Sequence, residues 1–229
     1  MNVFLTGEKN IGKSTIINRI LAFSNPSYAG FRSTITTVVH NPCKSCHMIP
    51  IYSDASRPPI QPAPSVRNEL FLCTPTGRCA PPHITGASSS ATSAADVPSA
   101  ADGTSAADVT IAADKLAATV EAASIITERF NSLGSKIIDA AFSRKGEIDL
   151  LIMDELGPAE ENADTFIAKI TQCLDSDTPV LGVLQKCNAK YINDIKNRND
   201  TKIFEVTKEN RDNIHIAIMS VMELWSHII

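Results

Sequence analysis

The chain has 229 residues, with 21 Lys and Arg against 25 Asp and Glu, a formal net charge of −4 and 43% apolar side chains. This composition is typical of a globular protein with enough apolar material for a core, and it argues against the clustered basic face that nucleic-acid binders usually carry. No apolar run approaches the roughly 18 residues that a membrane-spanning helix needs, and no signal peptide fits before the first expected strand. We therefore expect a cytoplasmic monomer without a nucleic-acid or membrane partner, folded as a single domain over residues 1–229.

The first 39 residues predict a strand, a glycine-containing loop, a helix and a second strand. An apolar strand is expected at Asn2–Thr6, and a Thr- and Val-rich strand at Ser33–Val39. The helix between them is indicated by apolar residues at helical spacing, which are Ile16, Ile17, Ile20 and Leu21. Strand, helix and strand in this order form the opening unit of an α/β fold.

The middle of the chain has an unusual composition. Residues 41–82 contain nine of the 13 prolines, so we expect irregular loops there, interrupted by short strands at Met48–Tyr52 and Glu69–Cys73. Residues 84–114 consist mostly of Ala, Ser, Thr and Asp with a six-residue repeat. A hexapeptide solenoid needs more large apolar side chains than this tract has, so we interpret it as a disordered, flexible insertion.

Helical and strand patterns alternate from Leu116 onward. A nearly continuous apolar run at Glu147–Met153 is typical of a parallel strand that is buried on both faces. The further expected elements are helices at Leu116–Phe130, Ser135–Ser143, Asp164–Leu174, Tyr191–Asn197 and Glu209–Ile228, and strands at Pro179–Leu184 and Lys202–Val206. This alternation predicts a doubly wound, mainly parallel α/β sheet.

A phosphate-binding motif follows the first strand. The pattern G-x-x-x-x-G-K-[ST] is fitted by Gly7, Glu8, Lys9, Asn10, Ile11, Gly12, Lys13 and Ser14. In such a P-loop, or Walker A motif, backbone N–H groups point inward and the helix N-terminus adds partial positive charge, so phosphates bind there. We expect Lys13 to reach the β- and γ-phosphates, the Ser14 hydroxyl to ligate Mg²⁺, and Thr15 to hydrogen-bond an inner phosphate.

Two acidic residues end the apolar strand of the second half and form a Walker B motif. A carboxylate at this position is delivered to the edge of a parallel sheet where ligands of such folds bind. Asp154 is then expected to be the Mg²⁺ partner through water, and Glu155 to act as the general base that polarises the attacking water.

Four motifs occur in an order that resembles the THEP1 family of nucleoside-triphosphatases. They are Met1–Thr15, Met153–Gly157, Pro179–Leu184 and Val206–Arg211. The resemblance implies a small RecA-like P-loop ATPase that slowly hydrolyses several nucleoside triphosphates with Mg²⁺, and it places Lys13, Ser14, Asp154 and Glu155 on the family's phosphate, magnesium and catalytic positions. It covers roughly residues 1–32 and 147–212, and Pro158 stands where some members have a basic residue.

Charge that develops on the γ-phosphate calls for a further cation in the same chain. Candidates are Arg32, Arg144 and Arg211, which lie in segments near expected sheet edges or motif loops. Gln185, directly after the strand Pro179–Leu184, is a candidate sensor of the γ-phosphate. For each arginine a purely structural role is an open alternative.

Zinc is a weaker alternative for the cysteines of the middle region. Cys43 and Cys46 have the C-x₂-C spacing of a zinc site, but five residues separate Cys73 from Cys79, so reduced free thiols are the preferred interpretation.

These patterns favour a nucleoside-triphosphatase that hydrolyses the γ-phosphate of ATP, GTP and other nucleoside triphosphates with Mg²⁺. Two alternatives stay open. A nucleoside or nucleotide kinase shares the P-loop but usually carries an arginine-rich lid, and the Pro-rich region offers only Arg57, Arg67 and Arg78. A nucleotide-dependent binding module would use hydrolysis only to reset the conformation that binds a partner.

Overall fold

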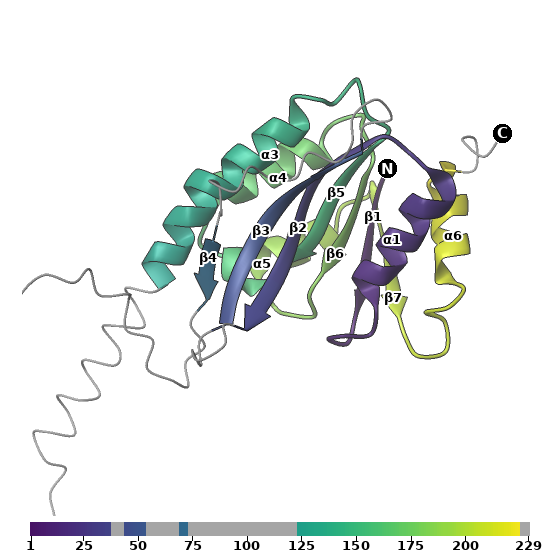
Figure 1. Cartoon of the computed structure of the whole chain (residues 1–229), viewed down its shortest axis with the longest axis horizontal. Coiled ribbons are helices and arrows are strands. Elements are labelled where there is room, and N and C mark those ends of the chain that lie inside the picture. Colours follow the sequence, from purple (N-terminus) through teal and green to yellow (C-terminus); the bar gives the residue numbers. More distant parts are fainter. Residues whose placement is uncertain (38–43, 54–68, 73–122, 225–229) are drawn as a thin grey trace, which may run out of the picture.

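Seven strands form one sheet among the residues that the computed structural model describes, which are 1–37, 44–53, 69–72 and 123–224 (Figure 1). Their order across the sheet is β4-β3-β2-β5-β6-β1-β7. The strands from β2 to β7 in this order are parallel, and β3 and β4 run antiparallel at one edge. The strand bounds are β1 Asn2–Gly7, β2 Tyr28–Thr37, β3 Lys44–Tyr52, β4 Glu69–Leu72, β5 Leu150–Leu156, β6 Val180–Leu184 and β7 Thr201–Val206. The expected mainly parallel sheet is thus confirmed.

Helices cover both faces of the sheet. Figure 1 shows α1 (Lys13–Ser24) beside α6 (Ile214–Val221), whereas α3 (Ser135–Phe142), α4 (Asp164–Leu174) and α5 (Lys190–Lys196) pack on the other face. The apolar side chains accordingly divide into two cores, and β1 contributes to both because every position of it except Thr6 is buried. None of the helices in the described part of the chain is long and apolar enough to cross a membrane.

The start of α4 depends on a side chain from a distant segment. Residues 123–129 are helical and continue through a π-helical turn, Phe130–Gly134, into α3. Ala163, which precedes α4, has no side-chain acceptor, and Asn131 Oδ1 instead accepts the N–H groups of Thr165 and Phe166 at 3.0 and 3.2 Å. Asn131 therefore caps α4 in place of a local residue.

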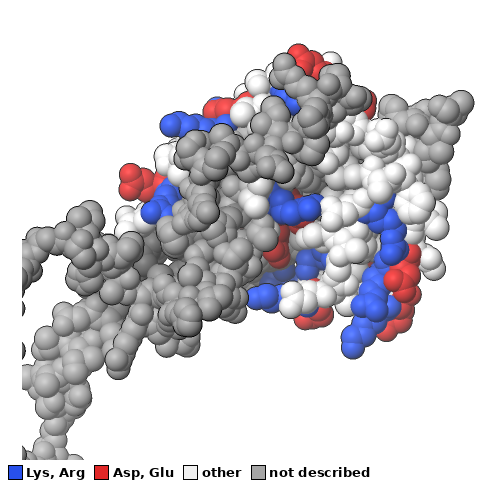
Figure 2. Space-filling model, in the orientation of Figure 1, with Lys and Arg blue, Asp and Glu red and all other residues white. Residues whose placement is uncertain are grey.

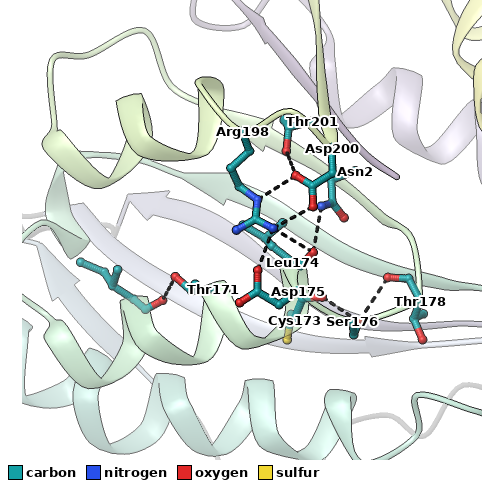
Figure 3. Close-up of polar contacts among 11 residues, drawn as sticks. Asn2, Thr171, Cys173, Leu174, Asp175, Ser176, Thr178, Arg198, Asp200 and Thr201 are labelled. Atoms are coloured by element: carbon teal, nitrogen blue, oxygen red, sulfur yellow. Dashed lines mark hydrogen bonds and ion pairs between the residues drawn. The ribbon is translucent and has the colours of Figure 1, made fainter.

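The opposite edge of the sheet from the P-loop is held by Arg198 (Figure 3). Its guanidinium donates to both carboxylate oxygens of Asp200 at 2.8 and 2.7 Å and to Asp175 Oδ1 at 2.7 Å. The hydrogen bonds from Arg198 to Asp200 lower the pKa of the Asp200 carboxyl group. Asn2 joins the group through the Leu174 carbonyl at 3.1 Å, so the start of β1 is tied to the end of α4.

Several element boundaries differ from the sequence-based expectations. β2 begins at Tyr28 rather than Ser33, because Gly30 allows a close approach to β5: a Cβ atom there would lie 2.0 Å from the Ile152 carbonyl oxygen. β5 spans Leu150–Leu156 rather than the expected Glu147–Met153, because its pairing with β6 extends to Leu156.

The last helix begins later than expected. Asn210 holds the preceding turn, since its side chain accepts the Thr207 N–H at 2.9 Å and donates to the Glu205 carbonyl at 2.8 Å. α6 therefore starts only at Ile214. The expected flexible insertion at 84–114 lies outside the described residues, as does most of the Pro-rich stretch except β3 and β4.

Candidate functional site

The P-loop joins β1 to α1 at the carboxyl edge of the sheet. Gly7, Asn10 and Gly12 have positive φ angles of 143°, 62° and 107°, which glycine adopts most readily. A Cβ atom on Gly7 would also lie 2.5 Å from the carbonyl oxygen of Val206 on β7. The two glycines therefore permit the tight curl that aims backbone N–H groups at an anion.

A pocket of about 790 Å³ opens over this loop. Of the nine residues that the sequence assigns to nucleotide binding, all except Ile11 are among its lining residues in the described part of the chain. Ile11 is buried and packs in the core that α1 and α6 cover. The other lining residues are Ser33, Glu155, Val183, Gln185 and Lys186.

Lys13 is folded across the loop and is only 8% exposed. Its ammonium group donates to the carbonyl oxygens of Gly7 at 3.0 Å and Glu8 at 2.8 Å. An ammonium group has three protons, so this arrangement holds the charge at the centre of the P-loop and leaves one proton for a ligand.

Ser14 and Asp154 meet at the place where a P-loop protein binds magnesium. The Ser14 hydroxyl donates to Asp154 Oδ1 at 2.9 Å, and Asp154 is fully buried. The hydroxyl and carboxylate oxygens are hard ligands of the kind that Mg²⁺ prefers, and Mg²⁺ usually takes only one or two protein ligands together with substrate phosphates. The residues therefore fit the ion, although the described residues contain no cluster of three or more His, Cys, Asp or Glu that would hold a metal alone.

Glu155 lines the pocket one residue beyond Asp154. Burial raises the pKa of its carboxyl group, against the nearby charge of Lys13 and a side-chain hydrogen bond from Gln185, which lower it. A carboxylate with a raised pKa accepts a proton more readily than an exposed one, as a general base requires. The structure thus brings Glu155 and the proposed sensor Gln185 together.

Arg32 lies beside Asp154 on the adjacent strand. Arg32 Nε donates to Asp154 Oδ2 at 2.9 Å, and its Nη2 donates to Asn18 Oδ1 at 2.7 Å. Arg144 precedes β5 and therefore lies at the opposite edge from the P-loop, 3.8 Å from Glu147 Oε2 and above the Tyr52 ring. Arg211 is exposed in the turn before α6 and is not among the pocket's lining residues in the described part of the chain.

Lys186 is a cation in the pocket that the sequence analysis missed. It directly follows Gln185, and its ammonium group lies 3.3 Å from Glu8 Oε1 of the P-loop and 2.8 Å from Glu205 Oε1 of β7. These two carboxylates raise its pKa. The sequence contains a signal for this residue, because Lys186 closely follows β6, which lies beside β1. The carboxyl ends of parallel strands share one edge of the sheet, so a residue at this position is expected near the P-loop.

Basic and acidic side chains are interspersed over the described surface in the view of Figure 2. Since the whole chain has 21 Lys and Arg against 25 Asp and Glu, its attraction for a polyanion depends on local groups such as Lys13 and the P-loop backbone. Of the four cysteines of the zinc alternative, Cys43, Cys73 and Cys79 lie outside the described residues, and the side chain of Cys46 in β3 is not described.

Comparison with known proteins gives a consistent result. The model of a family described as NTPase matches residues 100–219, just over half of the chain. The nucleoside-triphosphatase THEP1 of Thermotoga maritima is 33% identical over 91 residues, which are 40% of this chain and 51% of that protein. The cancer-related nucleoside-triphosphatase of Homo sapiens is 36% identical over 76 residues, which are 31% of this chain and 40% of that protein. The chain thus matches about half the length, or less, of these curated relatives.

Two solved structures share the fold. The crystal structure of THEP1 from the hyperthermophile Aquifex aeolicus has a TM-score of 0.56 and 16% identity, covering 97% of this chain and 99% of that chain. The solution structure of a human cancer-related nucleoside triphosphatase has a TM-score of 0.52 and 19% identity, covering 97% of each chain. At such identity the likeness concerns the fold alone.

Proposed function

Because the chain belongs to the NTPase family, whose model matches residues 100–219, we propose that it is a nucleoside-triphosphatase that hydrolyses the γ-phosphate of ATP, GTP and other nucleoside triphosphates with Mg²⁺. One observation carries this proposal: Lys13, Ser14 and Glu155 line a single pocket, and Asp154 is buried directly behind Ser14. Phosphate-binding groups and a candidate base therefore face the same space, which is the arrangement that hydrolysis needs.

In the proposed reaction, the oxygen of a water molecule attacks the γ-phosphorus while the bond to the bridging oxygen breaks, and Glu155 takes the proton of the water. Lys13 and the backbone N–H groups of the P-loop hold the phosphates and stabilise the charge on their oxygens. Ser14 and Asp154 are the residues that would hold Mg²⁺, which when bound neutralises phosphate charge. The raised pKa of Glu155 supports its role as the base.

Phosphate release from ATP, GTP, CTP and UTP by the purified protein tests this proposal. Lys13→Ala and Glu155→Gln are expected to reduce release by at least about 100-fold, because the first removes a charge that stabilises the phosphate and the second removes the base that takes the proton of the water. Lys202→Ala and Glu147→Gln are matched controls, since both residues are exposed and lie at the opposite edge of the sheet.

If Lys13→Ala and Glu155→Gln release phosphate as fast as the wild type, the proposal is wrong. Faster phosphoryl transfer to a nucleoside or nucleotide acceptor than to water would favour the kinase alternative instead. The cytoplasmic location, the monomeric state and the absence of a nucleic-acid partner stay predictions.

A further inference from the structure

The segment after β5 is fixed by a buried polar cluster. Glu160 is 5% exposed, and its Oε2 accepts the N–H of Gly157 at 3.0 Å. The hydroxyl of Tyr191, the second residue of α5, lies 2.5 Å from the Gly157 carbonyl oxygen and 3.1 Å from Glu160 Oε2. Both backbone polar groups of Gly157 are thus held by side chains.

The same segment is joined to α5 at a second point. Glu161 Oε1 accepts the N–H of Lys190, the first residue of α5, at 3.1 Å. The short 3₁₀ turn Pro158–Glu160 is therefore fixed against the first turn of α5 through two neighbouring glutamates. The contacts of Glu160 and Glu161 with α5 therefore restrict the position of Gly157.

Gly157 in turn packs against the side chain of Gln185. A Cβ atom at Gly157 would lie 2.6 Å from Gln185 Cδ and 2.8 Å from its Oε1, so the amide plane rests directly on the glycine. The Gln185 N–H also donates to the Leu156 carbonyl oxygen at 2.8 Å. Gln185 and Glu155 line the same pocket, and the Gln185 side chain lies close enough to the Glu155 carboxyl group to lower its pKa. A continuous series of contacts therefore runs from α5 to the candidate base.

We propose that Tyr191 and Glu160 are positioning residues of this site, which act through Gly157 to hold the Gln185 amide against Glu155 and so aim its carboxylate at the γ-phosphate. The inference rests on the proposed function and deepens it. None of the three supporting residues, Gly157, Glu160 and Tyr191, lines the pocket in the described part of the chain, so their effect on the reaction passes through Gln185.

The proposal predicts a loss of turnover without a loss of binding. Tyr191→Phe removes the hydrogen bond to the Gly157 carbonyl, and we expect kcat to fall about 10-fold. Gly157→Ala displaces Gln185 directly, and we expect kcat to fall about 100-fold. Small misplacements of catalytic groups have effects of this size. The Kd of a non-hydrolysable ATP analogue with Mg²⁺ is expected to change less than about twofold in both variants, because the P-loop is untouched. Tyr28→Phe, at the other edge of the sheet, is the matched control.

A double-mutant cycle separates positioning from a general structural role. In a Gln185→Ala background, Gly157→Ala is expected to cause no further loss of kcat, because the contact through which it acts is gone. The positioning role is contradicted if the losses of kcat from Gly157→Ala and Gln185→Ala multiply in the double variant. It is also contradicted if Tyr191→Phe and Gly157→Ala both keep the kcat of the wild type. Neither result contradicts the proposed hydrolysis.

A readout without turnover keeps the two proposals distinguishable. The side-chain amide resonance of Gln185, recorded by ¹H–¹⁵N NMR in the nucleotide-free protein, is expected to shift in Tyr191→Phe and Gly157→Ala and to stay in place in Tyr28→Phe. An unchanged resonance in both variants contradicts the positioning role even if the wild-type protein releases no phosphate. Absence of phosphate release alone contradicts only the proposed function.

Discussion

Arg32 and Asp154 form an ion pair between paired positions of β2 and β5, with Nε 2.9 Å from Oδ2. The second oxygen of the same carboxylate accepts the Ser14 hydroxyl, so the two oxygens have different partners. Because a buried carboxylate is costly unless it is paired, Arg32 compensates the charge of Asp154 through the oxygen that does not contact Ser14. Asp154, the proposed Mg²⁺ ligand, is therefore positioned by a residue of the neighbouring strand β2.

Removing this partner should destabilise the protein. We expect Arg32→Gln to lower the free energy of unfolding by about 1 to 3 kcal/mol, less than for a fully buried pair because the Arg32 side chain is 29% exposed. Chemical denaturation without nucleotide measures the change. Saturating Mg²⁺ and a non-hydrolysable ATP analogue should recover part of it, since the ion supplies positive charge at Asp154.

The matched control for this pair is the double variant Arg32→Gln with Asp154→Asn. Removing both charges leaves no uncompensated carboxylate, so the double variant should be more stable than Arg32→Gln alone. Equal stability of the two would contradict the assigned counter-ion role.

The buried carboxyl group of Glu160 predicts a pH dependence of stability. Burial is the main cause that raises its pKa from 4.5 to about 7, aided by the charge of Glu155 and opposed by hydrogen bonds from Gly157 and Tyr191. The folded state therefore binds a proton more tightly than the unfolded state, so stability decreases as the pH rises from about 4.5 to about 7. The size of this change is on the order of 3 kcal/mol at most.

Comparison with Glu160→Gln isolates the contribution of Glu160. The amide keeps an oxygen that accepts the Gly157 N–H but does not titrate, so the stability of the variant relative to the wild type should be higher at pH 8 than at pH 5. Urea denaturation at both pH values measures the difference. A constant difference between the two proteins would show that Glu160 does not titrate in this range.

The cap that Asn131 provides for α4 predicts a change in stability without any effect on the candidate site. Asn131→Ala removes the acceptor for two N–H groups of the first turn and should lower the free energy of unfolding by about 1 kcal/mol. Asn131→Asp keeps an acceptor and should be close to the wild type. Thermal denaturation checks both, and equal losses in the two variants would show that capping is not the cause.

The sequence predicts the local parts of the site better than the long-range ones. The P-loop and the acidic end of β5 follow from motifs in which every residue is close in the chain and flanked by a clear strand or helix pattern. The start of β2 is missed because it depends on Gly30 packing against Ile152, 122 residues away in the chain. Glu160 and Tyr191 are missed for the same reason, since only the fold brings α5 against the turn after β5.

Lys186 and Glu8 yield a prediction about nucleotide affinity. Glu8 belongs to the P-loop, and Lys186 compensates its negative charge at the pocket. We expect Lys186→Ala to weaken binding of Mg²⁺ and ATP analogue severalfold, because Glu8 then repels the phosphates and a nearby cation is lost. Fluorescence titration with a labelled non-hydrolysable analogue measures the Kd.

A second substitution separates the two causes of that loss. If Lys186 acts mainly by neutralising Glu8, Glu8→Gln combined with Lys186→Ala should restore most of the affinity, whereas direct contact with the phosphates predicts no recovery. Because Lys186 and Glu8 are both exposed, the effect should shrink as the salt concentration rises. A loss of affinity that is the same at low and high salt would contradict an electrostatic role for Lys186.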